Sequence, residues 1–152
     1  MDINEFLSPA NALVDVKVSD KARLLQELAH RAAVPLNLPA EQILRELVKR
    51  EELGSTGTGG GIAIPHARIP SLSKPFGILV RLKKPIDFDA IDGQPVDVLF
   101  LLLLPVTSDK EQLNALASVA RVLRNSESVS NLRRSRDSEG LFRAMVADNG
   151  KS

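Results

Sequence analysis

One apolar run constrains the fold of this chain more than any other segment. Val96 to Leu104 consists almost entirely of valine, leucine and phenylalanine, with Asp97 as the one interruption, and Pro105 ends it. A strand of this composition needs apolar cover on both of its faces, as in the centre of a sheet that lies between helices. We therefore expect a sheet with helical cover on both sides.

The other predicted elements surround this strand. Alternating apolar residues over 13–18 predict a short edge strand, and Phe76–Leu82 predicts a further strand. Apolar residues at helical spacing predict helices from Ser19 or Asp20 to Pro35, from Pro39 through Val48, from Ser108 through Leu123, from Ser126 to Arg134, and from Asp137 through Val146. This order favours an α/β fold: a single domain over 1–148, with a central mixed β-sheet flanked by helices, and a frayed tail at 149–152.

Composition excludes several classes of function. The chain has 152 residues, with 20 basic and 19 acidic side chains, so its charge does not indicate a nucleic-acid partner. Cysteine is absent, which removes disulfides, thiol nucleophiles and thiolate metal sites. The first residues do not resemble a signal peptide and no apolar run is long enough to span a membrane. We expect a cytoplasmic protein without a membrane partner.

Glycines concentrate in 54–61, immediately before the short apolar stretch 62–64 and His66. Such a segment can turn its backbone N–H groups towards an anion, and the stretch 62–64 predicts a buried strand with His66 at its end. A nucleotide-binding loop is disfavoured. The Gly-Lys-Ser/Thr ending of a Walker loop is missing, and Ile62 occupies the third glycine position of a dinucleotide motif.

Two interpretations of His66 remain. In the first, the glycine segment is only a flexible connection and His66 is an ordinary surface or core residue. In the second, the neutral imidazole attacks phosphorus directly, because one ring nitrogen carries a free lone pair near physiological pH. Backbone N–H groups and the hydroxyls of Ser55, Thr56 or Thr58 would then stabilise the transferred group.

Arg50 is the best nearby candidate for a cation that binds phosphate oxygens, because it continues the apolar stripe of its helix. It equally suits a second role, in which it neutralises the carbonyl end of that helix. Arg68 is a further candidate clamp, although a loop position two residues from His66 favours exposure to solvent.

Two separated motifs resemble a known family. The segments 50–57 and 62–67, together with 85–97 and the apolar strand that follows, resemble the type-2 enzyme IIA domains of the bacterial phosphoenolpyruvate-dependent phosphotransferase system, the fructose/mannitol class. The nitrogen-regulatory branch is the most similar. The resemblance covers nearly the whole chain.

This resemblance implies a helix-flanked mixed sheet, a phosphorylatable His66 and an active-site Arg50. It implies a histidine-containing phosphocarrier protein as the upstream donor and regulatory target proteins downstream. We expect no cofactor. The sequence contains no transporter or IIB segment, which favours regulation. A relay to a separate IIB protein stays open as an alternative.

One departure from the family pattern falls at Gln112, where a second histidine is expected. An amide can donate a hydrogen bond to a phosphate oxygen, but it cannot become a cation or exchange a proton as imidazole does. The departure supports a third alternative, a protein-binding regulator of the same fold that is not phosphorylated.

The remaining polar clusters have simpler interpretations. His30 is expected at a partly exposed helix position, and no metal site is predicted because no cluster at ligand spacing accompanies it. The arginines at 133, 134 and 136 suit a solvated helix end better than a patch for RNA or an acidic partner. The aspartates at 87, 89 and 92 are expected in turns.

Overall fold

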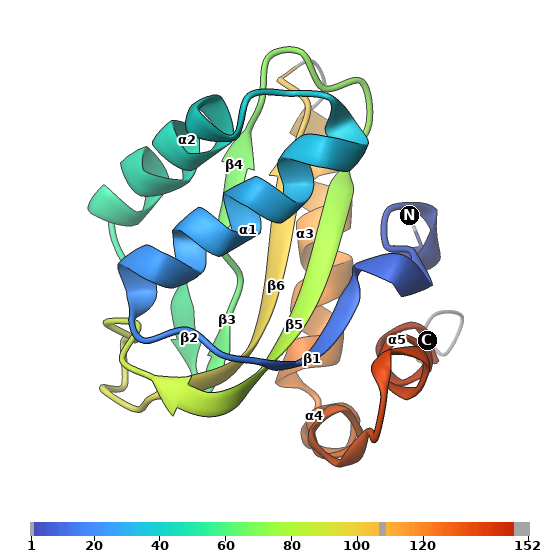
Figure 1. Cartoon of the computed structure of the whole chain (residues 1–152). Coiled ribbons are helices and arrows are strands. Elements are labelled where there is room, and N and C mark those ends of the chain that lie inside the picture. The colour runs from blue at the N-terminus through green and yellow to red at the C-terminus, as the bar shows by residue number, and fades with distance from the viewer. Residues whose placement is uncertain (1, 107–108, 148–152) are drawn as a thin grey trace.

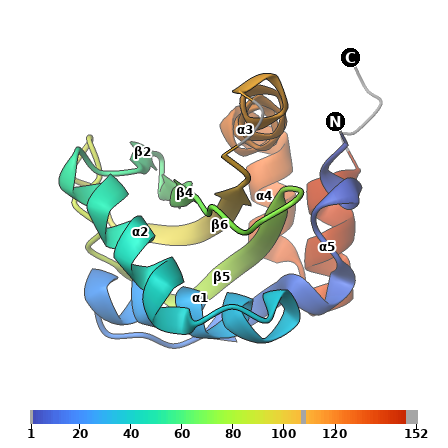
Figure 2. The same cartoon turned by 90° about the horizontal axis from the view of Figure 1, so that it is seen from above.

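A computed structural model describes residues 2–106 and 109–147 of the chain. Its centre is a six-stranded mixed sheet with helices on both faces (Figures 1 and 2). The strands are β1 (Ala12–Val16), β2 (Gly57–Gly59), β3 (Ile62–Ala63), β4 (His66–Arg68), β5 (Phe76–Ile86) and β6 (Val96–Leu104). The predicted α/β class with a central mixed sheet is confirmed. The predicted tail at 149–152 lies outside the described residues.

Strand order in the sheet is β1-β5-β6-β3-β2, with β4 also paired to β6. β1 runs parallel to β5, β5 antiparallel to β6, and both β3 and β4 parallel to β6. The predicted edge strand at the start of the chain is β1. Because β3 and β4 lie along the same side of β6, they form two halves of one interrupted strand.

Within the described residues, five α-helices and two 3₁₀ turns accompany the sheet. They are η1 (Ile3–Glu5), η2 (Pro9–Asn11), α1 (Lys21–Leu36), α2 (Ala40–Glu52), α3 (Asp109–Arg124), α4 (Ser126–Arg134) and α5 (Ser138–Val146). Figure 2 shows α1 and α2 on one side of the sheet and α3, α4 and α5 on the other. Asp20 caps α1 by accepting a hydrogen bond from Arg23 N at 2.8 Å, as the sequence predicts.

The core has two halves, one on each face of the sheet. Alternate side chains of β6 enter opposite halves: Leu101 packs with the residues beneath α1 and α2, and Leu102 packs with those beneath α3 and α5. Both are fully buried. Two-sided burial explains why β6 is apolar almost throughout, and it confirms the expectation drawn from the sequence.

Several predicted boundaries are wrong. β5 continues to Ile86, beyond the predicted end at Leu82, through Lys83 and Lys84, whose exposure leaves no apolar alternation to detect. α1 continues through Pro35 in its last turn and ends at Leu36, and the C-cap Asn37 has a left-handed backbone (φ 54°). Pro39 is the N-cap of α2 and not its first helical residue. Ser108, the predicted cap of α3, lies outside the described residues.

Candidate functional site

The sequence predicted His66 at the end of the strand 62–64. In the structure, His66 is instead the first residue of the next strand, β4. β3 stops at Ala63, and Ile64 and Pro65 separate it from β4. His66 then pairs with Leu102 of β6. The histidine therefore sits on a short strand beside the most buried strand of the protein, and its side chain is half-buried.

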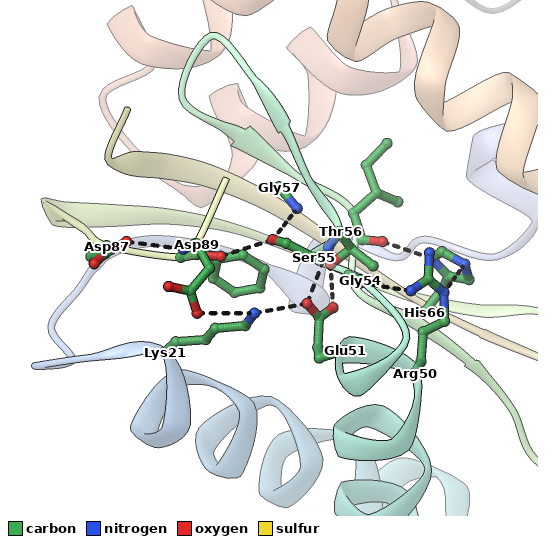
Figure 3. Close-up of polar contacts among 12 residues, drawn as sticks. Lys21, Arg50, Glu51, Gly54, Ser55, Thr56, Gly57, His66, Asp87 and Asp89 are labelled. Carbon is green, nitrogen blue, oxygen red and sulfur yellow. Dashed lines mark hydrogen bonds and ion pairs between the residues drawn. The ribbon is translucent and has the colours of Figure 1, made fainter. Parts of the chain in front are cut away.

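Both ring nitrogens of His66 have partners (Figure 3). Nδ1 lies 2.8 Å from the carbonyl oxygen of Ile64, and Arg50 Nε lies 3.4 Å from Nε2. A carbonyl oxygen can only accept a hydrogen bond and a guanidinium can only donate one. Nδ1 therefore carries the proton, and Nε2 presents its lone pair towards Arg50.

Burial lowers the pKa of His66 below its ordinary value of 6.5. The Ile64 carbonyl raises the pKa by a smaller amount, the charge of Arg50 lowers it, and that of Glu51 raises it. Near neutral pH the ring is thus uncharged. An uncharged imidazole with a free Nε2 lone pair can act as a nucleophile.

Arg50 lies beside His66 and also caps the chain just after its own helix, while its binding of phosphate oxygens stays a prediction. It lies in the last turn of α2, and besides facing His66 it donates from Nη1 to the carbonyl oxygen of Gly54 at 2.8 Å. That carbonyl lies just beyond the end of the helix. The segment that follows the helix therefore holds the guanidinium, while Nε of Arg50 remains directed at the histidine.

Ser55 and Thr56 do not bring their hydroxyls to the imidazole as the structure stands. The Ser55 hydroxyl donates to the carbonyl oxygen of Phe88 at 2.9 Å, and the Thr56 hydroxyl donates to Glu51. Thr56 is 4% exposed. A direct contact of either hydroxyl with a phosphoryl group stays a prediction.

The glycine segment forms a hairpin and does not form an open loop. Within it, β2 pairs antiparallel with β3. The backbone N–H groups of Thr56, Gly57 and Gly60 donate to Glu51, Ser55 Oγ and Asp92, respectively. These donors are satisfied within the chain, so the hairpin does not gather them around one anion.

The tip of this hairpin is fixed by Asp92 and Arg133, and the expectation that Arg133 only suits a solvated helix end is wrong. Asp92 accepts from Gly60 N at 3.0 Å, and hydrogen bonds from the backbone of Gly60 and then Gln94 lower the pKa of its carboxyl group. On the other side, Arg133 Nη2 donates to Gly60 O at 2.8 Å. The same guanidinium forms a two-pronged ion pair with Asp97, at 3.0 and 2.8 Å.

A groove of about 800 Å³ opens beside His66, between α2 and α3. Arg50 and His66 line it together with apolar side chains, among them Leu53 and Leu113. Leu53 is 84% exposed and Leu113 is 68% exposed. Gln112 belongs to α3 next to Leu113, but its side chain lies outside the described part of the structure.

Residues away from the groove agree with the simpler sequence interpretations. His30 lies on the exposed side of α1, and Asp87 and Asp92 each accept a hydrogen bond from an N–H two residues further on, as expected in turns. Across residues 2–106 and 109–147 the structure contains no group of three His, Asp or Glu side chains suited to a metal ion. None of the described helices has the length and apolar character required to cross a membrane.

Comparison with known proteins identifies the family of this chain. Residues 5–147 match the family model of the phosphoenolpyruvate-dependent sugar phosphotransferase system, EIIA 2. The chain belongs to this EIIA type-2 family. Its match covers both segments that carry the resemblance in the sequence, and it includes all the groups described around His66.

Relatives place the chain in the nitrogen-regulatory branch of the EIIA family. A nitrogen regulatory protein of Bradyrhizobium diazoefficiens is 42% identical over 146 residues, covering 96% of this chain and 95% of the relative. The crystal structure of the nitrogen regulatory protein IIA-Ntr from Neisseria meningitidis has a TM-score of 0.90 at 31% identity, covering 94% of this chain and 98% of that one.

The same fold occurs in a sugar-specific member of the system. The IIA mannitol enzyme of Escherichia coli, solved in a complex with phosphorylated enzyme IIB, has a TM-score of 0.77 at 13% identity, covering 93% of this chain and 99% of that chain. At this identity the likeness concerns the fold alone.

Proposed function

We propose that this EIIA protein accepts a phosphoryl group on Nε2 of His66 from a histidine-containing phosphocarrier protein in the cytoplasm. The observation that carries the proposal is the arrangement of the ring: Nδ1 donates to Ile64, and Nε2 faces Arg50 at 3.4 Å beside the groove. Membership of the EIIA family supports the same chemistry.

In the reaction, the Nε2 lone pair of His66 attacks phosphorus and forms a new P–N bond. The bond between phosphorus and the donor histidine breaks, and its electron pair returns to the donor imidazole. The Nδ1 proton stays on His66, where the Ile64 carbonyl stabilises the positive charge that develops on the ring. No separate base is needed.

Arg50 would contribute the charge that the transferred group requires. Its hydrogen bond to Nε2 is long and ends when the phosphoryl group arrives. The guanidinium can then bind the phosphoryl oxygens while Nη1 keeps its contact with Gly54. Ser55, Thr56 and Gln112 remain predicted contributors to stabilisation.

The output of this reaction is a change in the surface that partners contact. Phosphorylation places about two negative charges in a groove whose lining includes exposed Leu53 and Leu113. A regulatory target can therefore distinguish the bare groove from the phosphorylated one. The branch to which the chain belongs supports regulatory targets as the downstream partners.

Intact-mass measurement tests the proposal. The protein is incubated with phosphoenolpyruvate and the general phosphocarrier proteins, and we expect the mass of one phosphoryl group that acid removes. His66→Ala should abolish the adduct, whereas the matched variant His30→Ala should retain it. Labelling that persists in His66→Ala would refute the assignment. No adduct on the wild-type chain would favour a protein-binding regulator, and onward transfer to a IIB protein would favour a sugar relay.

A further inference from the structure

Two consecutive residues at the end of α2 reach the two different nitrogens of His66. Arg50 faces Nε2 directly. Glu51 reaches Nδ1 through Thr56 and Ile64, along a continuous series of hydrogen bonds. Glu51 has no direct hydrogen bond to His66 in the structure, and the reaction proposed above does not use it.

Glu51 is a buried carboxylate with well-defined partners. Its side chain is 7% exposed. It accepts from Thr56 N at 3.1 Å and from the Thr56 hydroxyl (Figure 3). Both polar groups of Thr56 that can donate are thus bound by one carboxylate, which fixes this residue against the end of α2.

Thr56 is connected to the histidine by two hydrogen bonds through Ile64. Its carbonyl oxygen accepts from Ile64 N at 3.0 Å. The carbonyl oxygen of Ile64 then accepts from Nδ1 of His66 at 2.8 Å. Because that last hydrogen bond keeps the proton on Nδ1, the position of Ile64 determines which nitrogen has the free lone pair.

Lys21 supplies the charge that allows a carboxylate to remain buried here. Its Nζ lies 3.0 Å from Glu51, its side chain is 18% exposed, and it also lies 4.6 Å from the centre of the Phe88 ring. A buried ion pair contributes little net stability compared with apolar packing, because both charges lose their hydration. Its presence beside the histidine is better explained by the geometry it imposes.

We propose that Glu51, with Lys21 as its counter-ion, is a positioning residue that holds His66 in the Nδ1-protonated tautomer through Thr56 and Ile64. This inference rests on the proposed function for its kinetic consequence, because the tautomer leaves Nε2 free for phosphorus. Loss of the carboxylate releases Thr56 and Ile64, and the proton then distributes between the two ring nitrogens.

The decisive measurement is the ¹⁵N NMR spectrum of the His66 ring in the unphosphorylated protein. Wild type should show one tautomer, with the proton on Nδ1. Glu51→Gln should show a mixture in which Nε2 also carries the proton. Glu41→Gln, on the exposed face of the same helix, should leave the spectrum unchanged. A Glu51→Gln spectrum identical to that of wild type would overturn the inference.

Kinetics provide a second readout. In Glu51→Gln, kcat for phosphoryl acceptance should fall about tenfold or more, since the reacting atom is no longer held in place. KM for the phosphocarrier should not change, because Glu51 does not line the groove and its exposed Leu53 and Leu113 are unaltered. An unchanged kcat would contradict a positioning role.

Two variants of Thr56 keep the test valid if Glu51→Gln does not fold. Thr56→Val removes the hydroxyl and preserves the ion pair, so it should shift the tautomer in the same direction. Thr56→Ser keeps a hydroxyl and should give the wild-type spectrum. Equal spectra for the two variants would contradict the proposed connection from Glu51 to His66 through Thr56. A wild-type chain that accepts no phosphate would refute the proposed function, whereas the tautomer measurement would still decide this inference.

Discussion

Arg50 Nε lies 3.4 Å from Nε2 of His66, so a permanent positive charge faces the unprotonated nitrogen of the ring. This charge disfavours the imidazolium form of the ring. Burial acts in the same direction on the ring and is the larger influence on its pKa. The site thus combines an uncharged imidazole with a cation that cannot be titrated away in the physiological range.

The pKa of His66 should lie below 6.5 and should rise when Arg50 is replaced by glutamine. The reason is that the guanidinium opposes protonation of the neighbouring ring. A ¹H–¹⁵N NMR titration of the histidine rings measures both values. Arg45→Gln, an exposed change on the same helix, is the control and should leave the pKa of His66 unaltered. An unchanged pKa in Arg50→Gln would contradict the observed geometry.

Acid should destabilise the wild-type protein through His66. Its folded-state pKa is below its unfolded value of 6.5, so the unfolded chain binds the proton more readily. The stabilising contribution is therefore complete above pH 6.5 and is lost as the pH falls through that value towards the folded-state pKa.

Urea unfolding at about pH 7.5 and about pH 5 measures this loss. His66→Gln should lose less free energy of unfolding between the two pH values than wild type, because it has no titrating group at this position. His30→Gln serves as the control for replacing a histidine on the surface. A His66→Gln variant as acid-sensitive as wild type would show that other groups govern the response.

Gly61→Ala should destabilise the hairpin more than Gly60→Ala. Both glycines have a left-handed backbone, with φ of 82° and 67°, so either alanine costs about 1 kcal/mol in conformational strain. A side chain at position 61 would also meet Arg133 Nη2 at 2.5 Å and Asp97 Oδ1 at 2.9 Å, whereas position 60 is open. Because the side chain would displace this ion pair, we expect a further loss of about 1 kcal/mol at Gly61, measured by urea unfolding. Equal losses for the two variants would contradict this packing.

Arg133 and Asp97 should be energetically coupled. Their two-pronged ion pair joins α4 to the start of β6, and Arg133 also binds the hairpin tip through Gly60 O. The pair is partly exposed, at 40% and 24%, so a coupling energy of about 1 kcal/mol is expected. A double-mutant cycle with Arg133→Gln and Asp97→Asn measures it. Strictly additive losses would mean that the pair does not contribute.

Leu53→Ser should weaken recognition by the phosphocarrier protein without affecting the fold. Leu53 is 84% exposed and lines the groove next to His66, as we expect for a residue that contacts the proposed donor. We expect a severalfold higher KM for the donor and a free energy of unfolding within about 0.5 kcal/mol of wild type. Val34→Ser, at 79% exposure on α1, is the matched control. Equal KM values for the two variants would place the docking surface elsewhere.

Much of the fold could be predicted because it depends on local patterns. The continuous apolar character of β6 follows from burial on both faces, and the cap at Asp20 follows from its position before an apolar stripe. The pairing of Arg50 with His66 could be anticipated as well. This prediction required only that the last turn of α2, which carries Arg50, lie close to the short strand that carries His66.

Other features depend on contacts between residues far apart in the sequence. Arg133 binds Gly60 and Asp97 across the fold, and no periodicity distinguishes it from Arg134 beside it. Glu51 lies only five residues from Thr56, yet its role depends on burial beneath Lys21, which comes from another helix. Hydrogen bonds of this kind arise from packing, so a single sequence does not reveal them.

The interruption between β3 and β4 makes the chain length at this point critical. Along a strand, successive side chains point to opposite faces, so a deletion of either Ile64 or Pro65 would reverse the faces of the residues that follow. Ala67, now in the core beneath α1 and α2, would turn to the opposite face of the sheet, and His66 would turn towards that core. Insertions and deletions should consequently be tolerated far better at the exposed hairpin tip than at Ile64 and Pro65. The number of residues between β3 and β4 determines the face of the sheet to which the His66 side chain points.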